Sequence, residues 1–318
     1  MSHSLMKSLL VATVLALAGG PSAQLAAAPA PAARAPAAQA QGPAAQAQEV
    51  DIALVLAVDV SGSIDYQEAE LQRKGIVDAF LSKEVIQAIQ SGSLGRIGIS
   101  VVYFSSADYG IMSVPVNWMV VQDMNSATTF VKTLVAARRP SARGTSIADA
   151  LQLSARMIET GPYHAVKRVI DVSGDGANNA GRAVLEVRDE VLAKGITINA
   201  LPIMDDTTMQ DLDKYFEGCV IGGPASFVIP AKGFGDFARA MRRKLVLEIS
   251  GLTPKEMPDS APRLIKVAAA ANPPQVGTRA RPTVPAPQQY NTRPPYPGGC
   301  DFPMFGGGFG NFGQFGFR

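Results

Sequence analysis

The sequence predicts an α/β fold: a three-layer, doubly wound, mostly parallel sheet with one antiparallel edge strand, flanked by disordered tails. Two observations lead to this prediction. Between residues 49 and 251, apolar runs of strand length alternate with longer segments of helical periodicity. The runs are apolar at nearly every position, which is typical of parallel strands covered by helices on both faces. About 200 residues are enough for one hydrophobic core, so we expect a single folded domain over 49–251.

The elements of this domain are expected in a regular order along the chain. The strands are expected at 51–60, 96–104, 113–121, 167–172, 196–203 and 226–229. The helices are expected at 66–90, 126–138, 146–160, 180–194, 209–216 and 234–248. Gly195 favours a helix end just before it. Pro115 lacks a backbone N–H and favours an edge position for its strand, so the hairpin-like pair within 96–121 supplies the antiparallel edge.

The first 28 residues have the layout of a secretory signal peptide. Lys7 comes before an apolar run over 9–18, and a Gly-Gly-Pro-Ser-Ala segment follows. The run is shorter than the roughly 20 residues that span a bilayer, so we expect cleavage and no transmembrane segment in the mature chain. The cut is expected after Ala23 or Ala28, and the sequence does not choose between them. The mature protein is expected in the periplasm or outside the cell.

Three further segments have compositions that do not suit a packed core. Residues 29–48 are rich in Ala, Pro and Gln, residues 252–297 are rich in Pro, and both are expected to be linkers. Residues 298–318, which we call the Gly/Phe tail, interleave Phe with Gly. This tail is expected either to be disordered or to bind an envelope surface, a partner or another copy of the chain through its aromatic side chains.

The charge and the cysteines bound the function in other ways. A formal net charge of +2 on 318 residues, without a run of Lys or Arg, argues against a nucleic-acid partner. The two cysteines are Cys219 and Cys300. Export permits a disulfide between them, but the sequence does not give their distance, so their pairing stays open.

Oxygen-bearing side chains occupy three loops at strand ends or helix starts. The first loop carries three of them, the second, in ARGTSIADAL, carries one, and the third, in DVSGDGANN, carries one. In chain order these residues are Asp59, Ser61, Ser63, Thr145 and Asp175. In open α/β sheets, binding sites form where the carboxyl ends of strands meet such loops. Taken one by one, the same residues are also ordinary helix caps and turn residues, and capping does not exclude metal binding.

Together the three loops resemble the metal-ion-dependent adhesion site (MIDAS) of von Willebrand factor A (VWA) domains, with its pattern Asp-x-Ser-x-Ser, a distant Thr and a distant Asp. All five positions are filled, and the stretches VDVSGSI, GTSIADAL and VSGDGANN are similar to an exported bacterial branch of unknown function. The resemblance covers roughly residues 50–250 and implies a Rossmann-like VWA fold. It also implies that the hydroxyls of Ser61, Ser63 and Thr145 bind a cation directly. Asp59 and Asp175 would then act through water or as hydrogen-bond acceptors.

The chemistry of the five side chains agrees with this resemblance. All of them offer hard oxygen and none offers sulfur or imidazole, which favours Mg²⁺, Mn²⁺ or Ca²⁺ over Zn²⁺ or Cu²⁺. A cation bound mainly by neutral hydroxyls stays electrophilic, so it accepts a carboxylate from an Asp or Glu of a protein partner. The sequence therefore predicts an exported, divalent-cation-dependent protein-binding module rather than an enzyme.

Two alternatives stay open. VSGDGANN also looks like the Gly-Asp-Gly-x-Asn-Asp loop of haloacid-dehalogenase-type, Mg²⁺-dependent phosphatases, with Asp59 as the nucleophile. Those enzymes need a second Asp two positions after the first and a final acid in the loop, where this chain has Ser61 and Asn179. The other alternative is a structural or interaction VWA protein that uses no metal.

Overall fold

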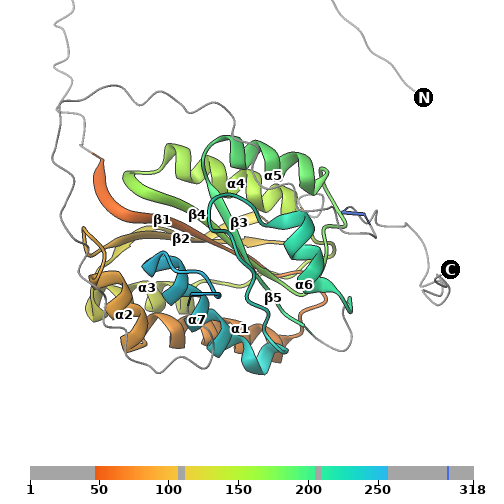
Figure 1. Ribbon diagram of the computed structural model, residues 1–318. Helices are drawn as coiled ribbons and strands as arrows, with labels where there is room; N and C mark the ends of the chain where they lie inside the picture. The colour runs from red at the N-terminus through yellow and green to blue at the C-terminus, as the bar shows by residue number, and fades with distance from the viewer. Residues whose placement is uncertain (1–46, 107–111, 205–208, 257–298, 301–318) are drawn as a thin grey trace, which may run out of the picture. The chain divides into compact units, whose positions relative to one another are not determined.

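The computed structural model of the protein describes residues 47–106, 112–204, 209–256 and 299–300. Its centre is a five-stranded sheet with helices packed on both faces (Figure 1). The predicted signal peptide, most of the two linkers and most of the Gly/Phe tail lie outside the described residues. No helix among the described residues has the length and the apolar character needed to cross a membrane.

The sheet has the mostly parallel arrangement that the sequence predicts. Its strands are β1 (Gln48–Asp59), β2 (Ile97–Phe104), β3 (Met112–Val121), β4 (Tyr163–Gly174) and β5 (Thr197–Pro202). They lie in the order β3-β2-β1-β4-β5. β1 pairs in parallel with both β2 and β4, and β4 pairs in parallel with β5. β3 is the antiparallel edge strand beside β2, and it carries Pro115, as expected.

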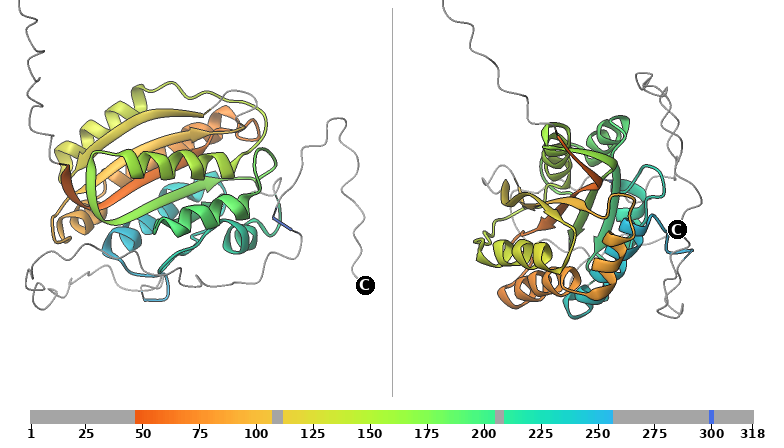
Figure 2. Two further views of the ribbon diagram at one scale, coloured as in Figure 1. Left: turned by 90° about the horizontal axis from the view of Figure 1, so that it is seen from above. Right: turned by 90° about the vertical axis from the view of Figure 1, so that its left-hand side faces the viewer.

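Helices cover the two faces of the sheet in separate layers, as Figures 1 and 2 show. One layer consists of α1 (Tyr66–Phe80), α2 (Lys83–Gln90), α3 (Met124–Ala136) and α7 (Phe237–Ser250). The other consists of α4 (Ile147–Thr160), α5 (Val184–Ala193), the short α6 (Leu212–Tyr215) and the π-helical turn η2 (Phe216–Val220). A 3-10 turn, η3 (Phe234–Asp236), leads into α7.

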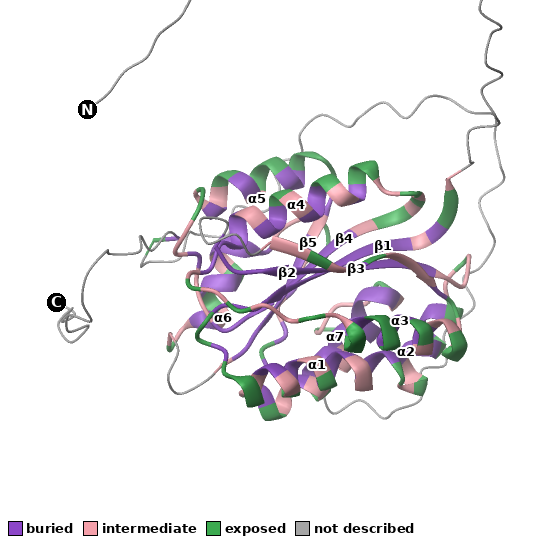
Figure 3. Cartoon of the chain, turned by 180° about the vertical axis from the view of Figure 1, so that it is seen from behind, coloured by how far each residue is buried: buried purple, intermediate pink, exposed green. Residues whose placement is uncertain are grey.

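The central strand β1 is apolar on both faces because helices cover both faces. Leu54 and Leu56 pack with the layer that contains α1 and α7, whereas Val55 and Ala57 pack with the layer that contains α4 and α5. All four side chains are buried. In Figure 3 the middle of the sheet forms a buried layer, and the exposed residues lie mainly on the outer faces of the helices and toward strand ends. This burial explains the uninterrupted apolar run that ends at the first candidate loop.

The helix expected at 209–216 is shorter in the structure, where α6 has four residues. Two other helices differ from the prediction for local reasons. The single helix expected at 66–90 is divided into α1 and α2, because Ser82 caps a new helix. The Oγ of Ser82 accepts a hydrogen bond from the N–H of Val85 at 3.3 Å. The helix expected from residue 180 begins at Val184, since Gly181 has a φ of +75°, which a right-handed helix does not contain.

The strands also differ at two places. β4 begins at Tyr163 rather than at 167, because its first residues continue the pairing with β1, where Tyr163 lies opposite Gln48. The segment expected as a strand at 226–229 makes no full strand. It adds one isolated parallel bridge to the sheet edge, between Val228 and Ala200 of β5.

Cys219 and Cys300 form a disulfide, with their Cα atoms 5.6 Å apart. Cys219 belongs to η2, and both cysteines are buried in the core on the α4 and α5 side of the sheet. The sequence contains no other cysteine, so the protein has no free thiol. The pairing that the sequence left open is therefore made in the structure.

Candidate metal centre

Three loops meet beside the carboxyl end of β1. Asp59 is the last residue of β1, and Asp175 directly follows Gly174 at the end of β4. The segment before α4 joins the first loop through an isolated bridge between Ala142 and Ser61. In chain order, strands are added on one side of β1 up to β3 and then on its other side from β4. Open α/β sheets build their binding sites at such a reversal.

A chain of hydrogen bonds joins four of the five predicted site residues. The Oδ1 of Asp59 accepts a hydrogen bond from the backbone N–H of Ser61 at 2.7 Å. The hydroxyls of Ser61 and Ser63 lie 3.0 Å apart. The hydroxyl of Ser63 donates to Oδ1 of Asp175 at 2.9 Å. The structure therefore brings the first and third loops into direct contact through their polar side chains.

Thr145 is held against the third loop by Asn179. The N–H of Thr145 donates to the Oδ1 of Asn179 at 2.8 Å, and the N–H of Asn179 donates to the carbonyl of Thr145 at 2.9 Å. A Cβ on Gly176 would lie 3.7 Å from the Oγ1 of Thr145, so this hydroxyl lies over the loop that carries Asp175. All five predicted residues are thus gathered at one edge of the sheet.

The site combines burial with negative charge. Asp59, Ser61, Thr145 and Asp175 are at most 4% exposed, whereas Ser63 is exposed. Burial first, and then the charge of Asp175, raise the pKa of Asp59 to about 7, although hydrogen bonds from Ser61 and the charge of Arg139 lower it. The Oδ2 of Asp59 is buried without a hydrogen-bond partner among the described residues. A bound cation would relieve both the unpaired oxygen and the repulsion between the carboxylates.

Several residues that support the site escape notice in the sequence. A Cβ on Gly174 would lie 2.8 Å from the Oδ2 of Asp59, so glycine is what allows this carboxylate to lie against β4. Asn179, which in the sequence only marks a departure from the phosphatase loop, holds Thr145 in place through a hydrogen bond.

The hydroxyls of Ser105 and Ser106 at the end of β2 are buried without hydrogen-bond partners in the described part of the chain.

The third loop is also tied to the disulfide. The N–H of Asn178 donates to the hydroxyl of Tyr215 at 3.0 Å, and this hydroxyl donates to the carbonyl of Cys300 at 2.9 Å. The side-chain oxygen of Asn178 accepts from the N–H of Ala148 in α4 at 3.1 Å. Asn178 therefore connects the loop of Asp175, the start of α4 and the residue that anchors the Gly/Phe tail.

The oxygen atoms gathered here fit a hard divalent cation better than a soft one. Within the described ranges, no group of three or more His, Cys, Asp or Glu side chains is arranged to hold a metal ion. A cation at this edge of the sheet would therefore depend on serine and threonine hydroxyls beside two carboxylates. Such all-oxygen surroundings are typical of Mg²⁺, Mn²⁺ and Ca²⁺ sites.

Residues 49–253 match the model of a family described as "Protein of unknown function (DUF1194)". The chain belongs to the DUF1194 family. No curated protein matches this DUF1194 chain.

Among solved structures, the DUF1194 chain is similar to the pilus adhesin SpaC from Lactobacillus rhamnosus GG, with 17% identity and a TM-score of 0.46. It is also similar to proximal thread matrix protein 1 from the mussel byssus, with 15% identity and a TM-score of 0.44. Both alignments cover 64% of this chain, but they span only 31% and 49% of the other two chains. BatB from Bacteroides thetaiotaomicron is similar at 15% identity and a TM-score of 0.37, over 63% of this chain and 99% of BatB.

Proposed function

We propose that this DUF1194 protein is an exported, divalent-cation-dependent protein-binding module with a MIDAS-type site. Asp59, Ser61, Ser63, Thr145 and Asp175 would hold Mg²⁺, or else Mn²⁺ or Ca²⁺, and the bound ion would capture an Asp or Glu carboxylate of a protein partner. The single observation that carries this proposal is the buried Oδ2 of Asp59, which has no hydrogen-bond partner among the described residues, beside the chain of hydrogen bonds that joins Asp59 to Asp175.

The five side chains suit such a site because they combine neutral hydroxyl oxygens, which are weak metal ligands, with carboxylate oxygens, which are strong ones. Ser61, Ser63 and Thr145 offer neutral hydroxyl oxygens, and the two aspartates orient these hydroxyls or bound water by accepting their hydrogen bonds. The cation supplies Lewis acidity that attracts an anionic oxygen. Ser63 is the exposed member of the set, so a partner's carboxylate would approach from its side.

Export is part of the same proposal and has two supports. One is the predicted signal peptide over residues 1–28. The other is the Cys219–Cys300 disulfide, since stable disulfides are typical of proteins in oxidising compartments. We place the mature protein in the periplasm or outside the cell.

Thermal unfolding of the full mature chain in Mg²⁺, Mn²⁺, Ca²⁺ or EDTA tests this proposal. A ligand that binds only the folded state stabilises it by mass action, by about 2.7 kcal/mol when its concentration is 100 times its dissociation constant. We expect the midpoint to rise with at least one of the ions. The variant Ser61→Ala/Ser63→Ala lacks two of the ligands and should lose that rise.

A matched control is available on α3. Thr129→Ala/Thr133→Ala also removes two hydroxyls, but both are exposed and donate to backbone carbonyls of the helix. This variant should keep the full response to the ion. A wild-type protein whose midpoint does not move at millimolar ion, or an equal rise in the Ser61→Ala/Ser63→Ala variant, would contradict a metal site at these residues.

A further inference from the structure

Arg139 lies beside the candidate metal centre, in the segment between α3 and α4 that also carries Thr145. Its Nη2 donates to the backbone carbonyl of Asp59 at 3.5 Å. Its Nε is buried and has no hydrogen-bond partner within the described ranges. The guanidinium is half-buried, and its charge acts on the carboxylates of both Asp59 and Asp175. The site edge therefore contains a fixed positive charge as well as two negative ones.

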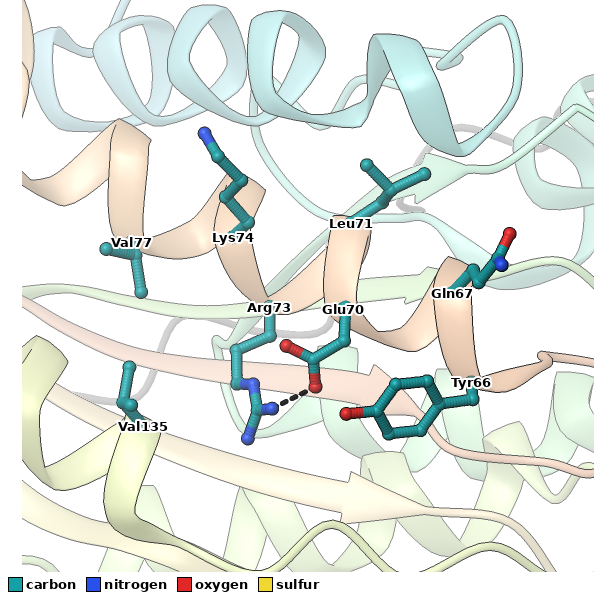
Figure 4. Close-up of a pocket in the computed structure, with 8 residues that line it drawn as sticks. All are labelled: Tyr66, Gln67, Glu70, Leu71, Arg73, Lys74, Val77 and Val135. Atoms are coloured by element: carbon teal, nitrogen blue, oxygen red, sulfur yellow. Dashed lines mark hydrogen bonds and ion pairs between the residues drawn. The ribbon is translucent and has the colours of Figure 1, made fainter.

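Arg139 has no close counter-ion of its own among the described residues. The charge of the nearby Arg73 also acts on Arg139, and Arg73 forms an ion pair with Glu70 in a groove of about 610 Å³ along α1 (Figure 4). Burial raises the pKa of the Tyr103 hydroxyl, and the charges of the two arginines offset part of that rise. Burial lowers the pKa of Arg139 itself, but an arginine stays charged at any ordinary pH. Among the described residues, Asp59 and Asp175 therefore compensate this partly desolvated cation at longer range.

The charge balance at this edge would reverse when a divalent cation binds. When both aspartates are ionised, they and Arg139 leave a net negative charge in the metal-free site. A divalent ion turns this into a net positive charge, and Arg139 then repels the ion. An arriving carboxylate would relieve that excess. Arg139 should therefore oppose binding of the free cation and favour binding of the anion that follows.

We propose that Arg139 is a specificity-determining residue that contacts the partner's carboxylate next to the metal ion. This inference rests on the proposed function and adds a second contact to it. The planar guanidinium presents parallel N–H donors that match the two oxygens of a carboxylate, which an ammonium does not do. It would also disfavour cationic groups and favour an anionic group such as the carboxylate of Asp or Glu.

Two titrations of the full mature chain test this role. Mn²⁺ is titrated alone, and acetate is then titrated into Mn²⁺-saturated protein, with water-proton relaxation by bound Mn²⁺ as the readout of both. For Arg139→Gln, we expect Mn²⁺ to bind about three- to tenfold more tightly, because one like charge is removed. Acetate should bind the same variant at least about threefold more weakly, because a charged donor is lost.

Two further variants separate charge from shape and position. Arg139→Lys keeps the charge but not the planar donors, so Mn²⁺ should bind as in wild type while acetate still binds more weakly. Arg138→Gln makes the same charge change one residue away, at an exposed position. It should alter either affinity by less than about twofold, because exposed charges are screened. Unfolding midpoints in EDTA confirm that each variant is folded.

The outcomes distinguish this inference from the proposed function beneath it. Opposite changes in the two affinities of Arg139→Gln support a carboxylate contact. Parallel changes in the two affinities, no change, or the same opposite changes in Arg138→Gln would overturn the carboxylate contact. Arg139 would then only support the loop, or act as any nearby positive charge does. A wild-type protein that binds no Mn²⁺ removes the proposed function, and the carboxylate contact with it.

Discussion

Ser63 donates a hydrogen bond to Asp175 at 2.9 Å, although the two residues are 112 positions apart in the sequence. The bond joins the loop after β1 to the loop after β4, which are neighbours only because β4 is inserted beside β1 in the sheet. The candidate ligands are therefore gathered only in the folded chain. Binding of an ion there would therefore require the folded chain, and the bound ion would in turn stabilise the fold.

The first prediction concerns Gly174→Ala. The new Cβ would lie 2.8 Å from the Oδ2 of Asp59, so the carboxylate or the end of β4 must move. In EDTA, we expect the free energy of unfolding to fall by about 1–3 kcal/mol, as at other overpacked positions. We also expect Mg²⁺ to stabilise this variant less than it stabilises the wild type. Thermal unfolding with and without Mg²⁺ measures both. Gly235→Ala is the control, since nothing lies within 4 Å of its added Cβ. An undiminished Mg²⁺ response in Gly174→Ala would count against Asp59 as part of the site.

The second prediction concerns the pH dependence of Asp59→Asn. Burial raises the pKa of Asp59 from 3.8 to about 7, so the folded state holds this proton more tightly than the unfolded state. The favourable contribution of the protonated group is then lost as the pH rises toward the folded pKa. The amide cannot ionise. In EDTA, the midpoint of Asp59→Asn relative to wild type should therefore increase between about pH 4 and about pH 7. A difference that does not change with pH would show that this carboxyl group ionises normally.

The third prediction concerns a buried ion cluster between β4 and α7. Lys244 is fully buried and lies 2.6 Å from Asp171 and 3.1 Å from Glu248. Lys244→Met leaves two buried carboxylates without their cation. We therefore expect the free energy of unfolding, measured in urea, to fall by about 3–5 kcal/mol. Lys74→Met removes an exposed partner of Asp78 and should cost at most about 1 kcal/mol. Equal losses in the two variants would show that burial of the cluster contributes nothing.

The fourth prediction separates binding from catalysis. The phosphatase alternative needs an acid at position 61, but the hydroxyl of Ser61 lies there and is 3.0 Å from that of Ser63. We therefore expect no turnover of p-nitrophenyl phosphate by the Mg²⁺-loaded protein. Turnover that disappears in Asp59→Asn and persists in Asp65→Asn, a change at the cap of α1, would instead establish an enzyme.

The order of strands and helices was predictable because each buried strand is a continuous apolar run. The same run predicts where Asp59 lies, since the polar residues begin where the strand ends. Element boundaries were less predictable. The break between α1 and α2 depends on one serine cap, and the start of α5 depends on the backbone angle of Gly181. Neither changes the hydrophobic period on which the prediction was based.

Much of what surrounds the predicted ligands was not predictable. Asn179 acts only because two loops far apart in the sequence meet, so its own neighbours in sequence give no signal. Arg139 follows another arginine in a polar loop and is indistinguishable there from a solvated side chain. Gly174 matters through a contact with a different strand. The ligand set itself stays a prediction, because hydrogen bonds among these side chains suit helix and loop stabilisation as well as a metal ion.

The disulfide has a consequence for proteolysis. It closes a covalent ring between Cys219 and Cys300, a separation of 81 positions that contains α7 and the Pro-rich linker. A peptidase that cuts once between residues 257 and 298 therefore leaves two fragments that stay joined. Cys300 would keep the C-terminal fragment attached to the domain after such a nick. Separating these two fragments would require reduction of the disulfide as well as the cut, and an oxidising compartment disfavours that reduction.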